Sequence, residues 1–263
     1  NTDTWKEIFD TIQKNKLRTF LSGFTVAMGI FIFIVLFGFG NGLQNSFNLS
    51  FIDDNVNTIR IYPSSTSIAY KGYKKNRAIE LTNDDINKIE NKFKKELDDI
   101  TVRVNDYAQV KYKEVSNGYS IRGVSPPHQS AELTIMMHGR FLNYDDMKYK
   151  RRHVVIGRLV AEYLFKKENP IGKYIFAGNH SWKVIGVFQD EGGDNEERMI
   201  YVPYTTLQKI NKDNDELDQI IVIYNNNITY AESVKLEKRL ELFIKKEKFI
   251  SPDDNRGVYI SNT

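Results

Sequence analysis

The feature that most constrains this chain is a long stretch without charge, because no residue from Thr19 to Ile52 is acidic or basic. Its first part, Phe20 to Phe39, supplies the ~20 apolar residues that a helix needs to cross a ~30 Å hydrocarbon core. A buried helix of a soluble protein rarely stays apolar on every side for so long. A cleaved signal peptide has a shorter apolar region, ~7–15 residues, and a cleavage site of alanine-like residues, whereas Phe39 lies among glycines. Residues 19–52 are therefore predicted to form an uncleaved transmembrane and stalk helix.

The flanking charges predict the orientation of this helix. Basic residues precede the uncharged stretch and acidic residues follow it: Lys6, Lys14, Lys16 and Arg18 before, Asp53 and Asp54 after. Because basic flanks stay on the cytoplasmic side, residues 1–18 are predicted to lie inside the cell. Residues 53–263 are then predicted to form an extracytoplasmic domain anchored in a bacterial inner membrane.

The helix is predicted to continue beyond the membrane as a stalk. After Gly40 the residues become mixed, yet Leu43, Phe47 and Phe51 recur every four positions and form one apolar face of a helix. A stalk with such a face requires a second helix beside it. At 1.5 Å per residue, a helix of this length extends well past the bilayer core.

An amphipathic pattern precedes the span. Trp5, Ile8, Phe9 and Ile12 follow the spacing of one helix face, and Thr4 with Glu7 forms a capping box ahead of them. Residues 1–18 are therefore predicted to contain a cytoplasmic amphipathic helix at the membrane interface. The alternative is that they are the solvated start of the transmembrane helix.

Composition excludes several classes of function. The 263 residues include no cysteine, so disulfides, thiolate metal sites and cysteine nucleophiles are excluded. A domain outside the cytoplasm without cysteine is typical of a bacterial periplasm or cell surface. The net charge of +3 is spread along the chain, and no basic block with interleaved aromatic residues indicates nucleic-acid binding.

The two ends of the extracytoplasmic region show the same order of elements. Each is predicted to contain a strand, a capped helix and a second strand. The first unit has strands at 56–62 and 100–104 and a helix capped by Thr82 and Asp85; the second has strands at 219–224 and 256–260 and a helix capped by Thr229 and Glu232. Neither unit can bury its helix face alone, so the halves 53–106 and 216–263 are predicted to pair into one α/β subdomain.

The middle of the chain, residues 107–215, is predicted to be a β-rich insertion, which makes the fold class α+β. Its predicted strands are 107–113, 119–124, 153–156, 174–177, 182–188 and 199–202, with a short helix between Gly157 and Pro170. The acidic stretch 189–198 is predicted to be an exposed flexible loop. It lacks the spacing of an EF-hand calcium loop.

A search for catalytic motifs finds none. The histidines His128, His138, His153 and His180 are scattered without metal-ligand spacing. Gly172-Lys173 lacks the first glycine and the final Ser or Thr of a phosphate-binding loop. No nucleophile-elbow or zinc-protease motif occurs. The sequence therefore predicts no catalytic, cofactor or metal site, and no enzyme activity.

Four segments in the middle region resemble a known family in order and spacing. They are Val154–Phe165, Asn169–Lys173, Trp182–Val187 and Ile200–Pro203, and they resemble the periplasmic core domain of MacB/FtsX-type ABC transporter permeases. The segments Asn15–Leu21 and Gly40–Leu43 are similar to the first transmembrane helix of that family. Lys166-Lys167 depart from the pattern, since the family tends to have glycine there.

The resemblance implies a role in mechanotransmission. A partner ABC ATPase would hydrolyse ATP in the cytoplasm, and a dimer of permeases would convey the motion to the periplasmic domains for export of drugs, peptides or lipoproteins. A periplasmic adaptor and an outer-membrane channel are further implied partners. A second long helix and three more spans would follow Thr263, with Trp5, Lys14 and Lys16 near the ATPase.

The sequence leaves two other classes of function open. One is a single-pass sensor ectodomain, and the other is a membrane-anchored enzyme, which the motif search disfavours. Within the resembled family, efflux, lipoprotein release and cell-division signalling share one architecture.

Overall fold

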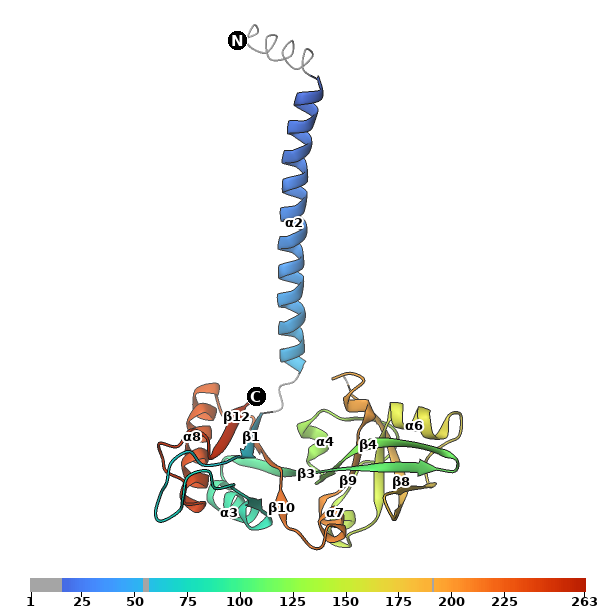
Figure 1. Cartoon of the computed structure of the whole chain (residues 1–263), viewed down its shortest axis with the longest axis vertical. Coiled ribbons are helices and arrows are strands. Elements are labelled where there is room, and N and C mark those ends of the chain that lie inside the picture. The colour runs from blue at the N-terminus through green and yellow to red at the C-terminus, as the bar shows by residue number, and fades with distance from the viewer. Residues whose placement is uncertain (1–15, 54–56, 191) are drawn as a thin grey trace. The chain divides into compact units, whose positions relative to one another are not determined.

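The computed structural model describes residues 16–53, 57–190 and 192–263 (Figure 1). The chain divides into two compact units, residues 1–55 and 56–263, which we describe separately. The predicted amphipathic pattern of Trp5, Ile8, Phe9 and Ile12 lies outside the described residues.

The first unit consists of one long helix, α2 (Lys16–Asp53). Its stretch Lys16–Val35 is long and apolar enough to cross a membrane. Large apolar side chains on all sides of that stretch are exposed, for example Phe20 (69%) and Phe33 (67%), which favours lipid over water as their surroundings. The Thr25 hydroxyl donates to the Leu21 carbonyl at 2.9 Å, so this polar group is satisfied within the helix. The helix continues through the predicted stalk, although the side chains of Leu43, Phe47 and Phe51 are not among those described.

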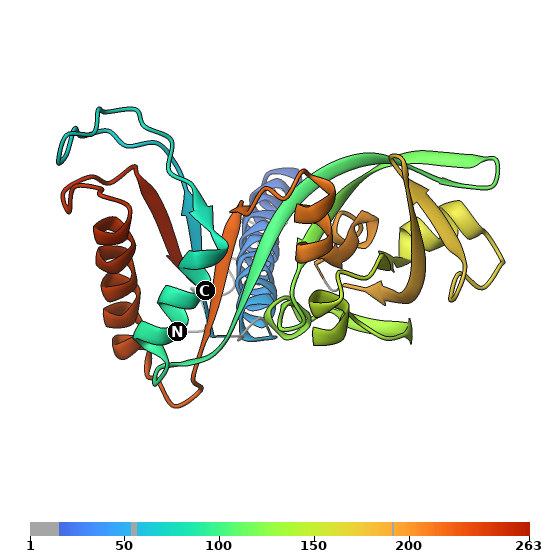
Figure 2. The ribbon, with the colours of Figure 1, turned by 90° about the horizontal axis from the view of Figure 1, so that it is seen from below.

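The second unit is a mixed sheet with helices packed on it (Figure 2). Its strands are β1 (Thr58–Pro63), β2 (Leu81–Thr82), β3 (Leu97–Tyr112), β4 (Val115–Val124), β5 (Ile135–Gly139), β6 (His153–Gly157), β7 (Tyr174–Ala177), β8 (His180–Gln189), β9 (Ile200–Pro203), β10 (Glu216–Leu217), β11 (Gln219–Tyr224) and β12 (Val258–Asn262). Its helices are α3 (Asn83–Phe93), α4 (His128–Ala131), α5 (Tyr144–Lys148), α6 (Arg158–Phe165), α7 (Tyr204–Ile210) and α8 (Tyr230–Glu247), with a 3₁₀ turn η1 (Glu196–Arg198).

The large sheet joins both ends of the chain to the middle. Its order is β12-β1-β11-β3-β4-β9-β6-β8-β5, with β7 pairing to β3 and β8, while β2 and β10 form a separate two-stranded sheet. β1 is antiparallel to both β11 and β12, so strands from residues 58–63 and 219–262 are direct neighbours. The parallel pairs are β4 with β9 and β6 with β8.

The capped helices at both ends of the domain are confirmed. The Asp85 carboxylate accepts from the Thr82 backbone N–H at 2.7 Å, and Glu232 accepts from the Thr229 N–H at 2.9 Å. These contacts satisfy donors that have no partner within the helix, which is why α3 begins after Thr82 and α8 after Thr229. The apolar faces of α3 and α8 are buried.

Two predicted strands are in fact one. Residues 100–104 and 107–113 were expected to be separate, but β3 runs without interruption from Leu97 to Tyr112. Its first part pairs with β11 and its second part with β4, so the backbone has a partner along the whole strand. The polar residues Asn105 and Asp106 therefore do not end it.

The core lies mainly on one face of the sheet. Strand alternation sends Val154 and Ile156 into a large apolar cluster that extends through both the ends and the middle of the domain. Val155 points to the opposite face, where it joins a smaller cluster with Phe188 and Tyr201. β5, α4, α5 and α7 are elements that the sequence did not predict.

Candidate functional site

A groove of about 430 Å³ lies where the end segments meet the middle segment. One wall comes from α3 and β3, and the other from α5, α7 and the residue that follows β4. The groove is lined by Ile86, Glu90, Lys94, Leu97, Asp98, Asp99, Ile100, Val102, Ser125, Tyr144, Met147 and Tyr204.

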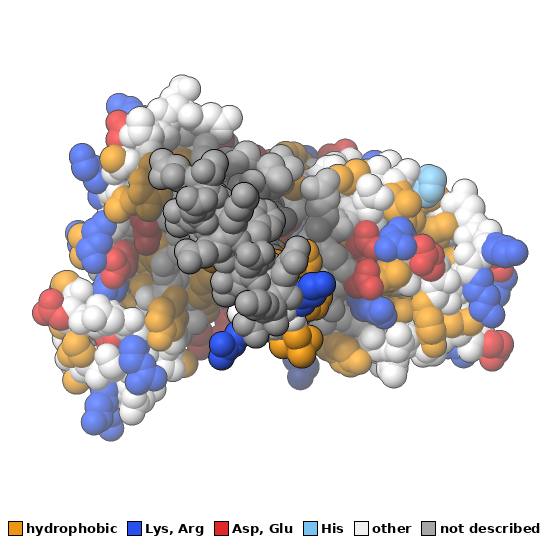
Figure 3. Space-filling view, turned by 90° about the horizontal axis from the view of Figure 1, so that it is seen from above, with side chains coloured by type: hydrophobic (Ala, Val, Ile, Leu, Met, Phe, Trp, Pro, Cys, Tyr) orange, Lys and Arg blue, Asp and Glu red, His pale blue; other side chains and the backbone are white. Residues whose placement is uncertain are grey.

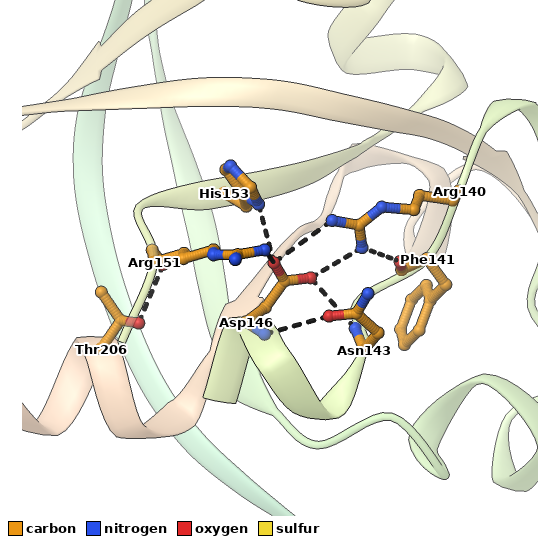
Figure 4. A network of polar contacts seen from close by, with 7 residues as sticks. All are labelled: Arg140, Phe141, Asn143, Asp146, Arg151, His153 and Thr206. Carbon is orange, nitrogen blue, oxygen red and sulfur yellow. Dashed lines mark hydrogen bonds and ion pairs between the residues drawn. The ribbon is translucent and has the colours of Figure 1, made fainter. Parts of the chain in front are cut away.

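The α5 wall is held by a network around a buried carboxylate (Figure 4). Asp146 is fully buried and accepts from Arg140 at 2.7 and 3.2 Å and from the Asn143 N–H at 3.0 Å. Its other contacts are His153 Nδ1 at 2.8 Å and an ion pair with Arg151 at 3.7 Å. In return, Asn143 Oδ1 accepts from the Asp146 N–H at 3.0 Å. These reciprocal bonds cap the N-terminus of α5 and hold this one-turn helix in place.

The same contacts set the charge of Asp146. Burial on its own would raise the pKa of this carboxyl group, but hydrogen bonds from Arg140, the Asn143 backbone and His153 outweigh burial and lower it. Asp146 therefore remains an anion, which keeps the surrounding cations in place.

Helix α7 is bonded to α5 and to the segment after it. The Thr205 hydroxyl donates to the Met147 carbonyl at 2.8 Å, and the Thr206 hydroxyl donates to the Arg151 carbonyl at 2.9 Å. These bonds join Tyr204 and Met147, both lining residues, into one wall.

Few side chains connect the two walls. The amides of Asn83 in α3 and Gln208 in α7 exchange two hydrogen bonds, each 3.0 Å long. Across the groove, Tyr144 Oη donates to Asp99 Oδ2 at 3.5 Å, a weak contact. Burial raises the pKa of Asp99, and burial together with the Asp99 charge raises the pKa of Tyr144. A third contact between the walls is the Ser125 hydroxyl, which donates to the Thr101 hydroxyl of β3 at 2.8 Å. The short β2–β10 pair is a further connection.

The groove is suited to binding a ligand that carries a positive charge beside apolar groups. Its lining has three carboxylates, Glu90, Asp98 and Asp99, against the single cation Lys94, with two tyrosines on the other wall. Carboxylates attract cations, and tyrosine rings offer flat apolar contact. No nucleophile with a neighbouring base lines it.

The four histidines do not come together. His128 is fully buried against the Tyr201 ring, with centroids 5.1 Å apart, and burial, aided by the charge of Arg103, lowers its pKa. His153 contacts Asp146, while His138 and His180 lie in β5 and β8. Within the ranges that the structure describes, no group of three or more side chains could hold a metal ion.

The acidic stretch 189–198 is only partly the predicted exposed loop: residues 192–195 are exposed, whereas its end is held by ion pairs. Glu197 is buried and pairs with Arg158, and Glu196 pairs with Arg122 at 3.0 Å. Residues 196–198 form the 3₁₀ turn η1. Arginines from the sheet and from α6, distant in sequence, hold this stretch, so its acidic composition alone could not show its structure.

The comparisons with known proteins agree on one family. A sequence profile of the MacB-like periplasmic core domain matches residues 19–236. Among curated proteins, the chain is 22% identical over 206 residues to a macrolide export ATP-binding/permease protein MacB of Bdellovibrio bacteriovorus, covering 77% of this chain and 32% of that protein. The MacB of Vibrio parahaemolyticus is 25% identical over 209 residues, covering 78% and 31%. The chain thus spans about a third of the length of these relatives.

Solved structures share the fold. The periplasmic region of MacB from Actinobacillus actinomycetemcomitans matches with a TM-score of 0.65 at 19% identity, over 78% of this chain and 88% of that one. The extracellular domain of the ABC-type transporter YknZ from Gram-positive bacteria matches with a TM-score of 0.63 at 17% identity, over 78% and 100%. Sequences this different have kept the same arrangement of strands and helices.

Proposed function

Since the chain belongs to the family of MacB-like periplasmic core domains, we propose that it is the permease part of an ABC transporter of this type. In this proposal a partner ATPase hydrolyses ATP in the cytoplasm, and this chain conveys the resulting movement to its extracytoplasmic domain. The chain itself carries out no catalysis.

The observation that carries the proposal is the position of the two ends of the domain. β1 follows α2 in the chain, and β12 ends the described residues, and the two strands are antiparallel neighbours. Ile59 pairs with Asn262, and the Thr263 N–H donates to the Thr58 carbonyl at 3.0 Å. A segment continuing from Thr263 would therefore start beside the segment that arrives from α2. If that segment formed a second membrane helix, it and α2 would both connect to the sheet at the paired strands β1 and β12.

Strand β1 is well placed to pass on a force. It is hydrogen-bonded on both sides, to β11 and β12, and its residues Ile59 and Ile61 are fully buried. A displacement of its start cannot be absorbed by the strand alone, because packed interiors resist deformation. The sheet moves with it. A continuous helix such as α2 is a suitable lever between two aqueous compartments.

The division of the domain supports movement within it. We propose that residues 53–106 and 216–263 form one α/β subdomain and that 107–215 form a β-rich subdomain inserted into it. The pairing of β1 with β11 and β12 supports the first part. β3 passes between the two parts, and the groove lies at their junction.

The proposed location is a bacterial inner membrane, with residues 1–18 cytoplasmic and the core domain outside. Basic residues before α2 and acidic residues after it support this orientation. Proposed partners are the ATPase, a second permease copy, and an adaptor that leads to an outer-membrane channel. The sensor alternative is disfavoured, because the similar proteins are transporters.

The groove is the proposed contact for exported compounds. Relatives are named for macrolide export, and we propose export of drugs, peptides or lipoproteins for this chain. The acidic and aromatic lining favours compounds with a positive charge beside apolar groups.

Affinity purification from the native membrane tests the proposal. The tagged protein, expressed from its own locus, is expected to carry an ABC ATPase in stoichiometric amount and to hydrolyse ATP. A tagged single-pass membrane protein of unrelated sequence is the control. Recovery of a signalling kinase in place of an ATPase would overturn the transporter proposal in favour of a sensor.

Orientation is tested with single cysteines, which the cysteine-free chain makes straightforward. In intact spheroplasts, a membrane-impermeant maleimide is expected to label Glu114→Cys, which lies exposed on the core domain, but not Lys6→Cys. The reverse labelling pattern would contradict the proposed orientation.

A further inference from the structure

A basic hairpin projects from the core domain between β1 and β2. We call residues 68–77 the arm; its sequence is Ile-Ala-Tyr-Lys-Gly-Tyr-Lys-Lys-Asn-Arg. It carries four cations, and the chain has no acidic residue between Asp54 and Glu80. Figure 2 shows the arm extending away from the body, and at the lower left of Figure 3 Lys and Arg side chains (blue) extend from it. The arm interleaves Tyr70 and Tyr73 with its basic residues, a local pattern that the net charge of the whole chain does not reveal.

The base of the arm is firmly fixed. The fully buried Asp254 carboxylate accepts from the Ser67 N–H at 2.7 Å, the Ser67 hydroxyl at 2.8 Å and the Ile68 N–H at 2.9 Å. It also accepts from the Arg256 N–H at 2.9 Å and the Gly257 N–H at 3.3 Å. The arm is therefore a built element with a defined direction.

The tip of the arm is a closed turn. The backbones of Tyr70 and Tyr73 exchange two hydrogen bonds, 3.0 and 2.9 Å long, around Lys71 and Gly72. Lys71 has a φ of 47° and Gly72 a φ of 85°, the left-handed backbone that a tight hairpin turn requires. A lysine adopts this conformation only at a cost. The Lys71 ammonium lies over the Tyr70 ring, 5.5 Å from its centroid.

The lysines of the arm have no carboxylate partner among the residues that the structure describes. Lys71, Lys74 and Lys75 are exposed, and none of them forms an ion pair with any residue that the structure describes. By contrast, Lys113 and Lys173 both pair with Glu168 elsewhere on the surface. The positive charge of the arm is thus available to another molecule.

An aromatic platform lies beside these lysines. The rings of Tyr73 and Phe249 stack with centroids 5.7 Å apart, and each residue is about half exposed. The Arg77 guanidinium lies 4.3 Å from the Tyr73 ring centre and donates to the Lys248 and Phe249 carbonyls at 2.6 and 3.1 Å. Exposed tyrosine and arginine held rigidly are enriched at the centres of protein interfaces.

The arm is remote from the place where the chain joins α2. β1 starts at Thr58, next to Thr263, and the arm follows its other end at Pro63. Six residues of strand separate the two places by roughly 20 Å. The arm and the connection to α2 therefore lie at opposite ends of β1.

We propose that the arm docks onto a carboxylate-rich surface of a second extracytoplasmic protein. Unpaired lysines steer the encounter and pair with the carboxylates, while Tyr73 and Arg77 supply contact area. The rigid base and closed turn reduce the ordering that binding requires. This inference rests on the proposed extracytoplasmic location.

Zero-length cross-linking is the direct test. A carbodiimide joins a lysine amine to a carboxylate in contact with it, so it reports the proposed contact itself. In intact cells the full-length protein is expected to give cross-linked peptides that join Lys71, Lys74 or Lys75 to Asp or Glu of another extracytoplasmic protein. Arm lysines that react with no second protein, while other lysines do, would overturn the proposal.

A charge-reversed variant provides the matched comparison. Lys71→Glu/Lys74→Glu/Lys75→Glu is expected to reduce the cross-linked product at least tenfold with an unchanged melting temperature. The control Lys111→Glu/Lys167→Glu/Lys209→Glu has the same change of net charge at exposed positions outside the arm and is expected to retain the product. Equal loss in both variants would show a general charge effect and contradict the proposal.

Two further measurements separate the remaining outcomes. Binding of the purified protein to phosphatidylglycerol vesicles that depends on the arm lysines, without protein cross-links, would assign the arm to a lipid surface and overturn the protein partner. Co-purification of the ATPase is scored in the same cells. If the ATPase co-purifies but the arm forms no cross-links, only the proposed docking of the arm is refuted. If the ATPase does not co-purify, the proposed transporter function is refuted.

Discussion

The groove and the arm are both polar, but they use their charged residues in opposite ways. Around the groove the polar groups are bonded to one another: Asp146 contacts four residues, Arg140, Asn143, Arg151 and His153. The amides of Asn83 and Gln208 join the two walls. In the arm, Lys71, Lys74 and Lys75 extend into solvent without ion pairs among the described residues. Polar groups that are hydrogen-bonded to one another define the shape of the domain. Charged groups without an ion pair, held on a rigid segment, remain able to bind another molecule.

The two regions nevertheless share one device, a buried carboxylate at the base. Burial alone would raise the pKa of Asp254, but hydrogen bonds from the backbone of Arg256, Ile68 and Ser67 and from the Ser67 hydroxyl lower it strongly. Asp146 is held in the same way by Arg140 and Asn143. Each carboxylate organises a segment that has little structure of its own.

The largest effect is expected at the base of the arm. Asp254→Ala leaves five donors without their acceptor, so we expect a loss of about 3–4 kcal/mol in the free energy of unfolding. The measurement is denaturant unfolding of the purified protein, followed by fluorescence of the buried Trp182. The control Asp253→Ala changes an exposed neighbour and is expected to stay within about 0.5 kcal/mol. A small loss at Asp254 would show that the arm is not anchored there.

A smaller loss is expected at the groove. Asp146→Ala removes the acceptor of Arg140, Asn143 and His153, of which Arg140 is partly exposed and can be rehydrated. We expect a loss of about 2–3 kcal/mol in the free energy of unfolding, measured in the same way. Asp145→Ala, on the exposed side of α5, is the matched control. If both variants were equally stable, the network would not be what holds the wall.

The lowered pKa values of these carboxylates predict acid sensitivity. Because the folded-state pKa of Asp254 lies below its unfolded value of about 3.9, its stabilisation is fully present above pH ~5 and is lost as the pH falls toward the folded-state pKa. The difference in unfolding free energy between wild type and Asp254→Asn is expected to shrink by about 2 kcal/mol between pH 6 and pH 2. A difference that stays constant over this range would contradict a charged Asp254.

The smallest effect concerns the bond between the walls. Asn83→Ala leaves the buried Gln208 amide without its partner, and Gln208→Ala does the same to Asn83. Each is expected to cost about 1 kcal/mol in unfolding free energy, and the double variant about the same as one single variant. A double-mutant cycle measures this coupling. Additive losses would show that the two amides do not act as a pair.

Local sequence patterns were sufficient to predict the elements that are determined by residues close in sequence. The capping residues Thr82 and Thr229 predicted the starts of α3 and α8, and the alternation of apolar and polar residues in 56–62 predicted β1. The family motifs were equally local, which is why the resemblance could be seen without a structure. The positive arm also had a local signal, but its charge was diluted in the count over the whole chain.

The elements that depend on distant partners could not be predicted. α5 is one turn long and owes its position to Arg140 and His153, and β5 is exposed and lacks alternation because it lies at the sheet edge. The groove requires Asn83 to meet Gln208, 125 positions apart. No pattern within a window of sequence contains such information.

We propose that ATP hydrolysis moves the extracytoplasmic domain, and a distance measured between two copies of the chain would report this movement. A spin label at Asn91→Cys, exposed on α3, reports that distance by pulsed electron paramagnetic resonance in the full-length complex with its ATPase. We expect two distance distributions, one without nucleotide and one with ATP bound under non-hydrolysing conditions, that interconvert with nucleotide. A single distribution that is the same in both states, while the complex still hydrolyses ATP, would contradict it.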